Sequence, residues 1–176
     1  MLEKYNRYKV LKVFFDSPTK EFGLRKIGRK ASLAPVSVMN YLKEFEKKGL
    51  IEKKKEGKVS SYIARRGDEN FVFYKKIGFL NELHNSGLIE ELWYKLSPKT
   101  IILYGSYAKG EAIENSDIDI FIIGKEKKIN LNKFEEKLNG KIHLMFSEDL
   151  KNVGKELINN LVNGIILKGY FKVLKW

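Results

Sequence analysis

Apolar residues in the first fifty positions recur at helical spacing and predict three helices. The first is expected over residues 5–15 and the second over residues 23–31. Pro35 opens the third helix, because proline lacks a backbone N–H and an N–H in the first turn would have no intrahelical partner anyway, and Gly49 ends the helix. The expected buried stripe of this third helix consists of Val38, Leu42 and Phe45.

After Gly49 the apolar spacing changes from helical to strand-like. Residues 50–66 therefore predict a β-hairpin, with Glu56 and Gly57 in its turn. The order of three helices and a hairpin over residues 4–66 resembles the winged helix-turn-helix fold of bacterial and archaeal regulators. This resemblance implies a DNA-binding domain.

The second half of the chain alternates strand and helix patterns. Residues 68–97 predict helices that break near Ser86 and Gly87, link the two halves and pack on the second. The elements expected after them are a strand at 100–104, a glycine-rich turn at 105–110, a strand at 117–123, a helix near 130–139, a strand at 141–146 and a helix near 148–162. Such alternation favours an α/β or α+β domain.

Composition excludes several classes of protein. The 176 residues are 43% apolar and 32% charged, which argues against disorder and collagen-like repeats. With no cysteine there is no disulfide and no Cys-bearing zinc site, and only His84 and His143 supply imidazoles. Because no apolar run is long enough to cross a bilayer and the first twenty residues lack a secretory signal, we expect a soluble cytoplasmic protein without membrane contact.

The positive charge is concentrated in one half of the chain. Residues 1–66 hold 18 Lys and Arg against 7 Asp and Glu, a net charge of +11, whereas residues 67–176 have a net charge of only +1. Lys and Arg gain free energy by displacing counterions from phosphates, so the first half is expected to face a polyanion. General lysine enrichment would account for the total charge but not for its uneven distribution.

The most specific pattern lies in residues 102–123. Gly105 and Ser106 follow one expected strand, and Asp117 and Asp119 begin the next. Side chains alternate along a strand, so the two aspartates project from one face and the isoleucines beside them from the other. Two carboxylates so close repel each other unless a cation lies between them, and oxygen ligands favour Mg²⁺ or Mn²⁺.

The glycine-serine turn suits a phosphate. Gly105 allows the backbone to approach closely, while the Ser106 hydroxyl and the N–H groups that follow supply donors. A triphosphate held by this turn and a metal ion held by the aspartates would be oriented for attack at the α-phosphorus. That chemistry is nucleotidyl transfer.

The glycine-serine pair, its spacer and the Asp-x-Asp resemble the nucleotidyltransferase core of the DNA polymerase beta superfamily. Residues 86–176 are most similar to its minimal prokaryotic members, which transfer a nucleoside monophosphate to a hydroxyl. The resemblance implies that Gly105 and Ser106 bind a nucleoside triphosphate and that Asp117 and Asp119 bind the metal ion and are catalytic. It also implies that Lys109 meets a phosphate.

One residue departs from that pattern. The family has a third carboxylate on a later strand, and the matching position in this sequence is His143. Hard divalent ions prefer oxygen, so a two-metal mechanism is weakened. If the strand register differs, Glu148 or Asp149 takes that place. A histidine on a strand more often makes a local hydrogen bond than does chemistry.

The basic half offers candidate contacts to double-stranded DNA. In a winged helix the third helix enters the major groove, and residues from its neighbours grip phosphates. The predicted DNA contacts are Arg25, Lys26, Arg29, Ser37, Asn40, Lys43, Lys54, Lys55 and Lys58, with Lys30 and Lys53 beside them. Protein contact or dimerisation is the alternative, since winged helices do not all bind nucleic acid.

These patterns predict an α+β chain with a winged helix-turn-helix domain at 1–66, a helical linker at 67–97 and a nucleotidyltransferase domain with a small mixed sheet at 98–176. The leading hypothesis is a metal-dependent nucleotidyltransferase coupled to DNA binding, with an unidentified hydroxyl as acceptor. The first alternative is a nucleotide-sensing regulator without catalysis. The second is an antitoxin that modifies a partner toxin, as the resemblance implies. A homodimer on a two-fold DNA site is a further hypothesis.

Overall fold

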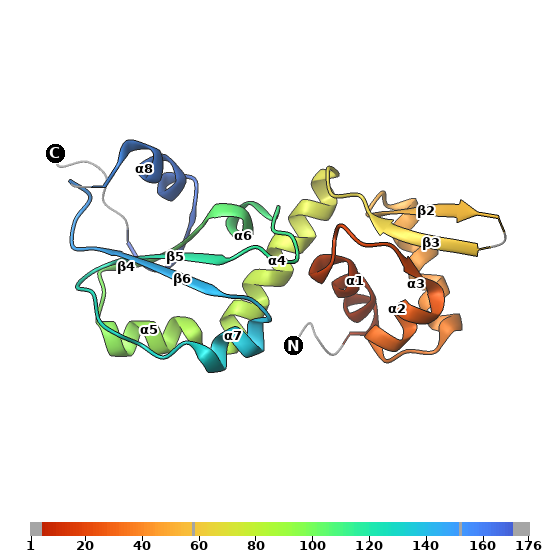
Figure 1. Cartoon of the computed structure of the whole chain (residues 1–176), viewed down its shortest axis with the longest axis horizontal. Coiled ribbons are helices and arrows are strands. Elements are labelled where there is room, and N and C mark those ends of the chain that lie inside the picture. Colours follow the sequence, from red (N-terminus) through yellow and green to blue (C-terminus); the bar gives the residue numbers. More distant parts are fainter. Residues whose placement is uncertain (1–4, 58, 152, 171–176) are drawn as a thin grey trace. The chain divides into compact units, whose positions relative to one another are not determined.

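The computed structural model describes residues 5–57, 59–151 and 153–170. It is a mixed α and β structure with two compact units, Met1–Gly78 and Phe79–Trp176. Helix α4 (Glu69–Ser86) crosses from the first unit into the second (Figure 1). Among the described residues, no helix is both long enough and apolar enough to cross a membrane.

The N-terminal unit contains the three predicted helices and the predicted hairpin. Its elements in chain order are α1 (Asn6–Asp16), β1 (Phe22–Gly23), α2 (Leu24–Ala31), α3 (Pro35–Lys47), β2 (Ile51–Glu56) and β3 (Val59–Ala64). The strands form an antiparallel sheet in the order β1-β3-β2. Strand β1 was not predicted, because two residues are too short to show any alternation.

Helix α3 buries the stripe that its sequence predicts. Val38, Leu42 and Phe45 are completely buried, and Pro35 occupies the first turn. Aromatic rings fill the space between the helices and β1, with Phe14 edge-on to Phe22 at 6.0 Å between ring centroids. The core of this unit therefore fixes which face of α3 remains outside.

The C-terminal unit is built on a four-stranded sheet. Its elements are α5 (Leu88–Leu96), β4 (Thr100–Tyr104), α6 (Gly105–Lys109), β5 (Ile118–Ile123), α7 (Asn132–Leu138), β6 (Ile142–Ser147), α8 (Lys155–Val162) and β7 (Ile165–Gly169). The strand order is β6-β5-β4-β7. Strands β5 and β6 are parallel and the other pairs antiparallel, so the sheet is mixed, as predicted.

Helices cover both faces of this sheet (Figure 1). Ile118, Ile120 and Ile122 of β5 face a core shared with α5 and α7, whereas Phe121 and Ile123 face a core shared with Leu161 of α8. The alternation predicted for β5 is therefore confirmed. Residues of α4 and α5 that were expected in a linker form part of the first of these cores; they are Phe79, Leu83, Leu88, Ile89, Leu92 and Leu96.

The end of the unit differs from the sequence prediction. Helix α8 begins at Lys155 and not near residue 148, and β7 was not predicted. A Cβ at Gly164 would lie 2.7 Å from the carbonyl oxygen of Leu103, so only glycine lets the chain approach β4 here. The Thr100 hydroxyl also donates a hydrogen bond to the carbonyl of Tyr170. Strand β7 thus depends on its partner β4.

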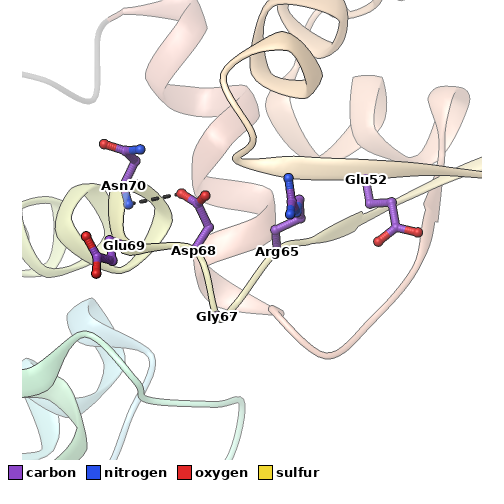
Figure 2. Close-up of a pocket in the computed structure, with 6 residues that line it drawn as sticks. All are labelled: Glu52, Arg65, Gly67, Asp68, Glu69 and Asn70. Atoms are coloured by element: carbon purple, nitrogen blue, oxygen red, sulfur yellow. Dashed lines mark hydrogen bonds between the residues drawn. The ribbon is translucent and has the colours of Figure 1, made fainter.

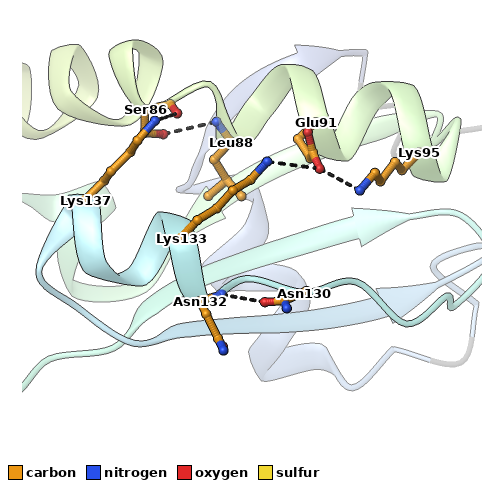
Figure 3. A network of polar contacts seen from close by, with 8 residues as sticks. All are labelled: Ser86, Leu88, Glu91, Lys95, Asn130, Asn132, Lys133 and Lys137. Carbon is orange, nitrogen blue, oxygen red and sulfur yellow. Dashed lines mark hydrogen bonds and ion pairs between the residues drawn. The ribbon is translucent and has the colours of Figure 1, made fainter.

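A polar network joins α5 to α7 on one side of the sheet (Figure 3). The Glu91 carboxylate accepts from Lys95 at 2.7 Å and lies 3.4 Å from the Lys133 ammonium. The hydrogen bond from Lys95, with a further one from Lys133, holds the pKa of Glu91 below its ordinary value. Lys137 donates to the carbonyl of Ser86 at 3.3 Å, at the break between α4 and α5. These contacts hold α7 in place ahead of β6.

Candidate functional site

Three strands bring polar residues together at one end of the C-terminal sheet. Tyr104, the last residue of β4, pairs with Asp119 of β5, and Asp119 pairs with His143 of β6. Because β5 and β6 are parallel, the first residues of both strands lie at the same end. Gly105 follows directly after Tyr104. The structure therefore brings Gly105 and Asp119 together, although they are far apart in the sequence.

Asp119 lies against the backbone of Gly105. A Cβ at Gly105 would be 2.5 Å from the Asp119 Oδ2 atom, so the Asp119 carboxylate would have to move to make room for any other residue. Gly105 also has a φ of +72°, a conformation that favours glycine. Both facts favour glycine at this position, because any other residue would be strained and would displace the Asp119 carboxylate.

The second aspartate is more open. Asp117 immediately precedes β5 and is exposed, whereas the Asp119 side chain retains 26% of its exposure. Asp117 lies just outside the strand, so the alternation of β5 places Asp119 and not Asp117. Within the part of the chain that the structure describes, Asp117 forms no ion pair. One exposed carboxylate and one partly buried carboxylate therefore stand at the start of β5, and the second of them lies beside Gly105.

His143 occupies the position across from Asp119. Its Nδ1 atom lies 3.3 Å from Asp119 Oδ1, and its side chain is 58% exposed. Glu148 and Asp149 follow the opposite end of β6, about 16 Å along the strand from His143. The register that would have placed them opposite Asp119 is therefore not the one in the structure, because both residues follow the far end of β6.

Tyr104 is the residue of β4 that pairs with Asp119. Its hydroxyl donates to the sulfur of Met145 at 3.0 Å. Burial, and next the charge of Asp119, raise the pKa of Tyr104 above its ordinary value, so the phenol stays protonated. Sequence analysis did not identify Tyr104, since an aromatic residue at a strand end carries no distinctive pattern.

The carboxylates at this place suit a hard cation whose remaining ligands come from a bound substrate. Among the described residues, no group of three or more His, Asp or Glu side chains is arranged to hold a metal ion. Mg²⁺, however, is usually bound through one or two carboxylates together with water and substrate phosphates. Asp117 and Asp119 meet that requirement, and the imidazole of His143 is a poorer ligand for such an ion.

The short helix α6 carries the other predicted residues of the site. Ser106 is partly buried in its first turn, and Lys109 is exposed at its last position. The segment was expected as a turn, but five of its residues are helical. Ser106 and Lys109 thus lie on the helix that begins at Gly105.

A side chain of α7 holds the start of β6. Glu135 accepts from the backbone N–H of Ile142 at 2.9 Å and from Lys141 at 3.2 Å. The bond from Ile142, followed by that from Lys141, holds the pKa of Glu135 below its ordinary value. Because His143 follows Ile142, Glu135 helps to fix His143 opposite Asp119.

The predicted DNA contacts of the N-terminal unit lie on its surface. Every one of them that the structure describes is exposed; they are Arg25, Lys26, Arg29, Ser37, Asn40, Lys43, Lys54 and Lys55, and Lys58 lies outside the described residues. Arg25 and Arg29 line a hollow with Ser32, Leu33 and Pro35 at the turn between α2 and α3.

Two of these lysines already have partners. Lys54 lies 2.8 Å from the Glu21 carboxylate, and this hydrogen bond, followed by one from Ser61, holds the pKa of Glu21 below its ordinary value. Lys26 lies 5.4 Å from the centre of the Phe22 ring. Both contacts are exposed and weak, so a phosphate can compete with them.

A second hollow in this unit is lined mainly by polar side chains (Figure 2). It lies between Glu52 of β2, Arg65 and the beginning of α4. Asp68 accepts hydrogen bonds from the N–H groups of Asn70 and Phe71, at 3.0 and 3.1 Å. Asp68 therefore caps α4, and this hollow has a structural explanation.

Residues 86–168 match the model of one protein family, described as the nucleotidyltransferase domain. The match covers a little under half of the chain and contains Gly105 and Asp119, which lie against each other. It supports nucleotidyl transfer as the general chemistry of the C-terminal unit. No curated protein matches the chain.

Proposed function

We propose that the C-terminal unit transfers a nucleoside monophosphate from a nucleoside triphosphate to a hydroxyl group. The observation that carries this proposal is the fit of the Asp119 carboxylate against Gly105, within the segment that is similar to nucleotidyltransferase domains. It links the residue proposed to hold the metal ion to the turn proposed to hold the phosphates.

Each residue has a distinct task in this proposal. The backbone at Gly105 and the hydroxyl of Ser106 hold the triphosphate, and Lys109 pairs with a phosphate oxygen. Asp117 and Asp119 hold Mg²⁺ or Mn²⁺, which neutralises charge on the phosphates when it is bound. His143 supports the orientation of Asp119 through the contact between Nδ1 and Oδ1.

The reaction then needs only correct positioning. The acceptor oxygen bonds to the α-phosphorus, the bond from that phosphorus to the β-phosphate oxygen breaks, and pyrophosphate leaves. The hydroxyl proton is released to solvent. The chain contributes by holding the triphosphate with its leaving group in line with the acceptor.

Transfer of label from α-³²P nucleotides tests the proposal. Wild-type protein is incubated with each of the four nucleoside triphosphates, Mg²⁺ or Mn²⁺, and a cell lysate as the source of acceptors. The Asp117→Asn/Asp119→Asn variant should lose transfer by at least about 100-fold. Asp149→Asn, at the far end of β6, is the matched control and should retain it.

The outcome also decides between the proposed alternatives. Label on a small molecule or nucleic acid supports the transferase, and label on a protein tyrosine favours the antitoxin hypothesis. Metal-dependent nucleotide binding without transfer, together with a nucleotide-dependent change in DNA affinity, favours the regulator. The regulator stays under consideration because His143, and not a carboxylate, pairs with Asp119 across β5 and β6.

We also propose that the N-terminal unit binds double-stranded DNA. The supporting observation is the exposed row of Ser37, Asn40 and Lys43 on α3, next to the hollow that Arg25 and Arg29 line. Within the described part of the chain, neither arginine forms an ion pair. Both guanidinium groups are thus available to phosphates.

Fluorescence anisotropy with a labelled duplex tests this second proposal. Arg25→Ala/Arg29→Ala should weaken binding at least about tenfold at low salt. The slope of log affinity against log salt concentration should fall by the amount that corresponds to about two phosphate contacts. Lys125→Ala/Lys128→Ala removes the same charge from an exposed loop of the other unit and should leave affinity unchanged. Equal losses in both variants would mean that net charge alone drives binding.

A further inference from the structure

The outer face of α3 combines one amide with apolar groups. Val36, Asn40 and Lys43 lie at positions i, i+4 and i+7, so they share one face of the helix. This face is opposite the buried stripe of Val38 and Leu42. The core of the unit therefore determines that these three side chains point outward together.

Val36 is the unusual member of that face. It is 68% exposed, although a β-branched side chain lowers helix propensity and gains nothing from contact with water. Met39, beside it, is 37% exposed. These two residues thus present methyl groups to the exterior within the first two turns of α3.

Positive charge surrounds the same end of the helix. The hollow lined by Arg25 and Arg29 also includes Pro35, the residue before Val36. Phosphates held there would place the beginning of α3 next to the base edges of a duplex. Lys43 lies about 10 Å farther along the helix axis, within reach of the groove or of a phosphate.

The chemistry of this face matches one type of base pair. In the major groove an asparagine amide pairs with N7 and N6 of adenine, and an apolar side chain contacts the methyl group of thymine. Guanine is recognised chiefly by Arg or Lys, and residues 35–42 contain neither. The first two turns of this face therefore have partners for adenine and thymine and none for guanine, whereas Lys43, in the third turn, is the one member of the face whose side chain is able to contact guanine.

Resting on the proposed DNA-binding function, we propose that α3 selects A·T base pairs in the major groove. Asn40 contacts adenine, and Val36 contacts the methyl group of the neighbouring thymine. The proposal makes Val36 a specificity-determining residue, a role that no charge or hydrogen bond would have indicated.

Duplex polymers that differ by single chemical groups test this proposal with the full-length chain. Binding is measured by competition against a labelled duplex at low salt. Poly(dA-dT) should compete at least about tenfold better than poly(dG-dC). Poly(dA-dU), which lacks only the thymine methyl group, should compete about threefold less well than poly(dA-dT).

Variants identify the residues responsible. Val36→Ala should reduce the difference between poly(dA-dT) and poly(dA-dU), because the shorter side chain contacts the thymine methyl group less closely, and Asn40→Ala should reduce the preference over poly(dG-dC) about tenfold. Val162→Ala is the matched control, because Val162 is also an exposed valine on a helix, at 54%, in the other unit. Circular dichroism verifies that each variant is folded.

Each other outcome overturns a defined part of the proposal. Poly(dI-dC) has the minor groove of an A·T duplex but no thymine methyl group, so binding equal to poly(dA-dT) would place recognition in the minor groove and overturn the role of α3. Equal binding of all polymers would overturn A·T selection and leave DNA binding intact. Absence of binding to every polymer would overturn both.

Discussion

The two units position their candidate functional residues in different ways. In the N-terminal unit these residues come from one stretch of the chain and lie on the surface opposite a buried stripe, as Asn40 does relative to Leu42. In the C-terminal unit, Gly105, Asp119 and His143 come from three separate segments that meet at one end of the sheet.

This difference predicts different sensitivities. A helix surface tolerates substitution, because each exposed side chain contacts little of its own unit. A site assembled from strand ends depends on glycine, register and sheet order together. Surface changes in the first unit should therefore alter affinity gradually, whereas a single methyl group in the second unit should abolish activity.

The largest expected effect comes from substitutions that destabilise the hydrophobic core of one unit at a time, because they should abolish the activity of that unit alone. Phe45→Ala removes a fully buried ring from the N-terminal core and should destabilise that unit by about 3–5 kcal/mol. DNA binding should be lost, and nucleotidyl transfer should change by less than about twofold. Phe121→Ala, in the other core, should have the reverse effect.

Tryptophan fluorescence distinguishes the two unfolding events. Neither tryptophan, Trp93 or Trp176, falls within the N-terminal unit Met1–Gly78, so fluorescence during urea unfolding reports the C-terminal unit. Circular dichroism reports both units. Loss of transfer in Phe45→Ala would contradict the separation, because it would show that the second unit depends on the first.

The next effect concerns the fit at Gly105. In Gly105→Ala the new Cβ displaces Asp119, so transfer should fall by about 100-fold or more. Gly87→Ala is the control, since Gly87 has a similar φ of +79° but nothing near its Cβ. Both variants should lose about 1 kcal/mol of stability from backbone strain, and only the first should lose transfer. Equal activity in the two would refute the proposed site.

A moderate effect on metal affinity is expected at His143, which stands where the family resemblance implies a third carboxylate. His143→Asp places a hard oxygen ligand opposite Asp119 and should lower the Mg²⁺ concentration for half-maximal transfer about tenfold. The measurement is a metal titration of the transfer rate. His84→Asp adds the same charge at an exposed position of α4 and should have no effect. An unchanged titration in both variants would argue against metal binding at this end of the sheet.

The smallest effect concerns Glu135. Glu135→Gln weakens the hydrogen bond from the backbone N–H of Ile142 and should lower the melting temperature by about 1–2 °C at neutral pH. Because the folded-state pKa is lowered, this contribution is complete above the ordinary pKa of a glutamate. It is lost only as the pH falls through the lowered value.

A pH series of melting curves tests that sign. The difference between wild type and Glu135→Gln should stay constant near neutrality and disappear in acid. Glu136→Gln, an exposed neighbour on α7, should match wild type at every pH. A difference that grows on acidification would contradict the assigned cause.

Much of the secondary structure could be predicted from the sequence alone. The stripe in α3 and the alternation in β5 depend on spacings within one segment, and the structure confirms both. Strands β1 and β7 could not be predicted in this way. Strand β1 is only two residues long, and β7 needs the partner β4 and the close approach at Gly164.

For the candidate site, the sequence identified the residue types but not their contacts. The spacing of Gly105, Asp117 and Asp119 indicated nucleotide chemistry, and the match over residues 86–168 supports that general conclusion. The alternative with Asp149 could not be rejected before the register of β6 was known. Tyr104 and Glu135 were missed, because their roles come from neighbours across the sheet.

The sequence by itself therefore determined the three N-terminal helices, the hairpin, the uneven charge and the acidic motif, since each depends on local spacing or on composition. Only the tertiary structure decided that Asp119 lies against Gly105 and opposite His143. The physical reason is that contacts between strands depend on sheet order and register. Both are set by the packing of the whole unit and leave no periodic pattern in any one segment.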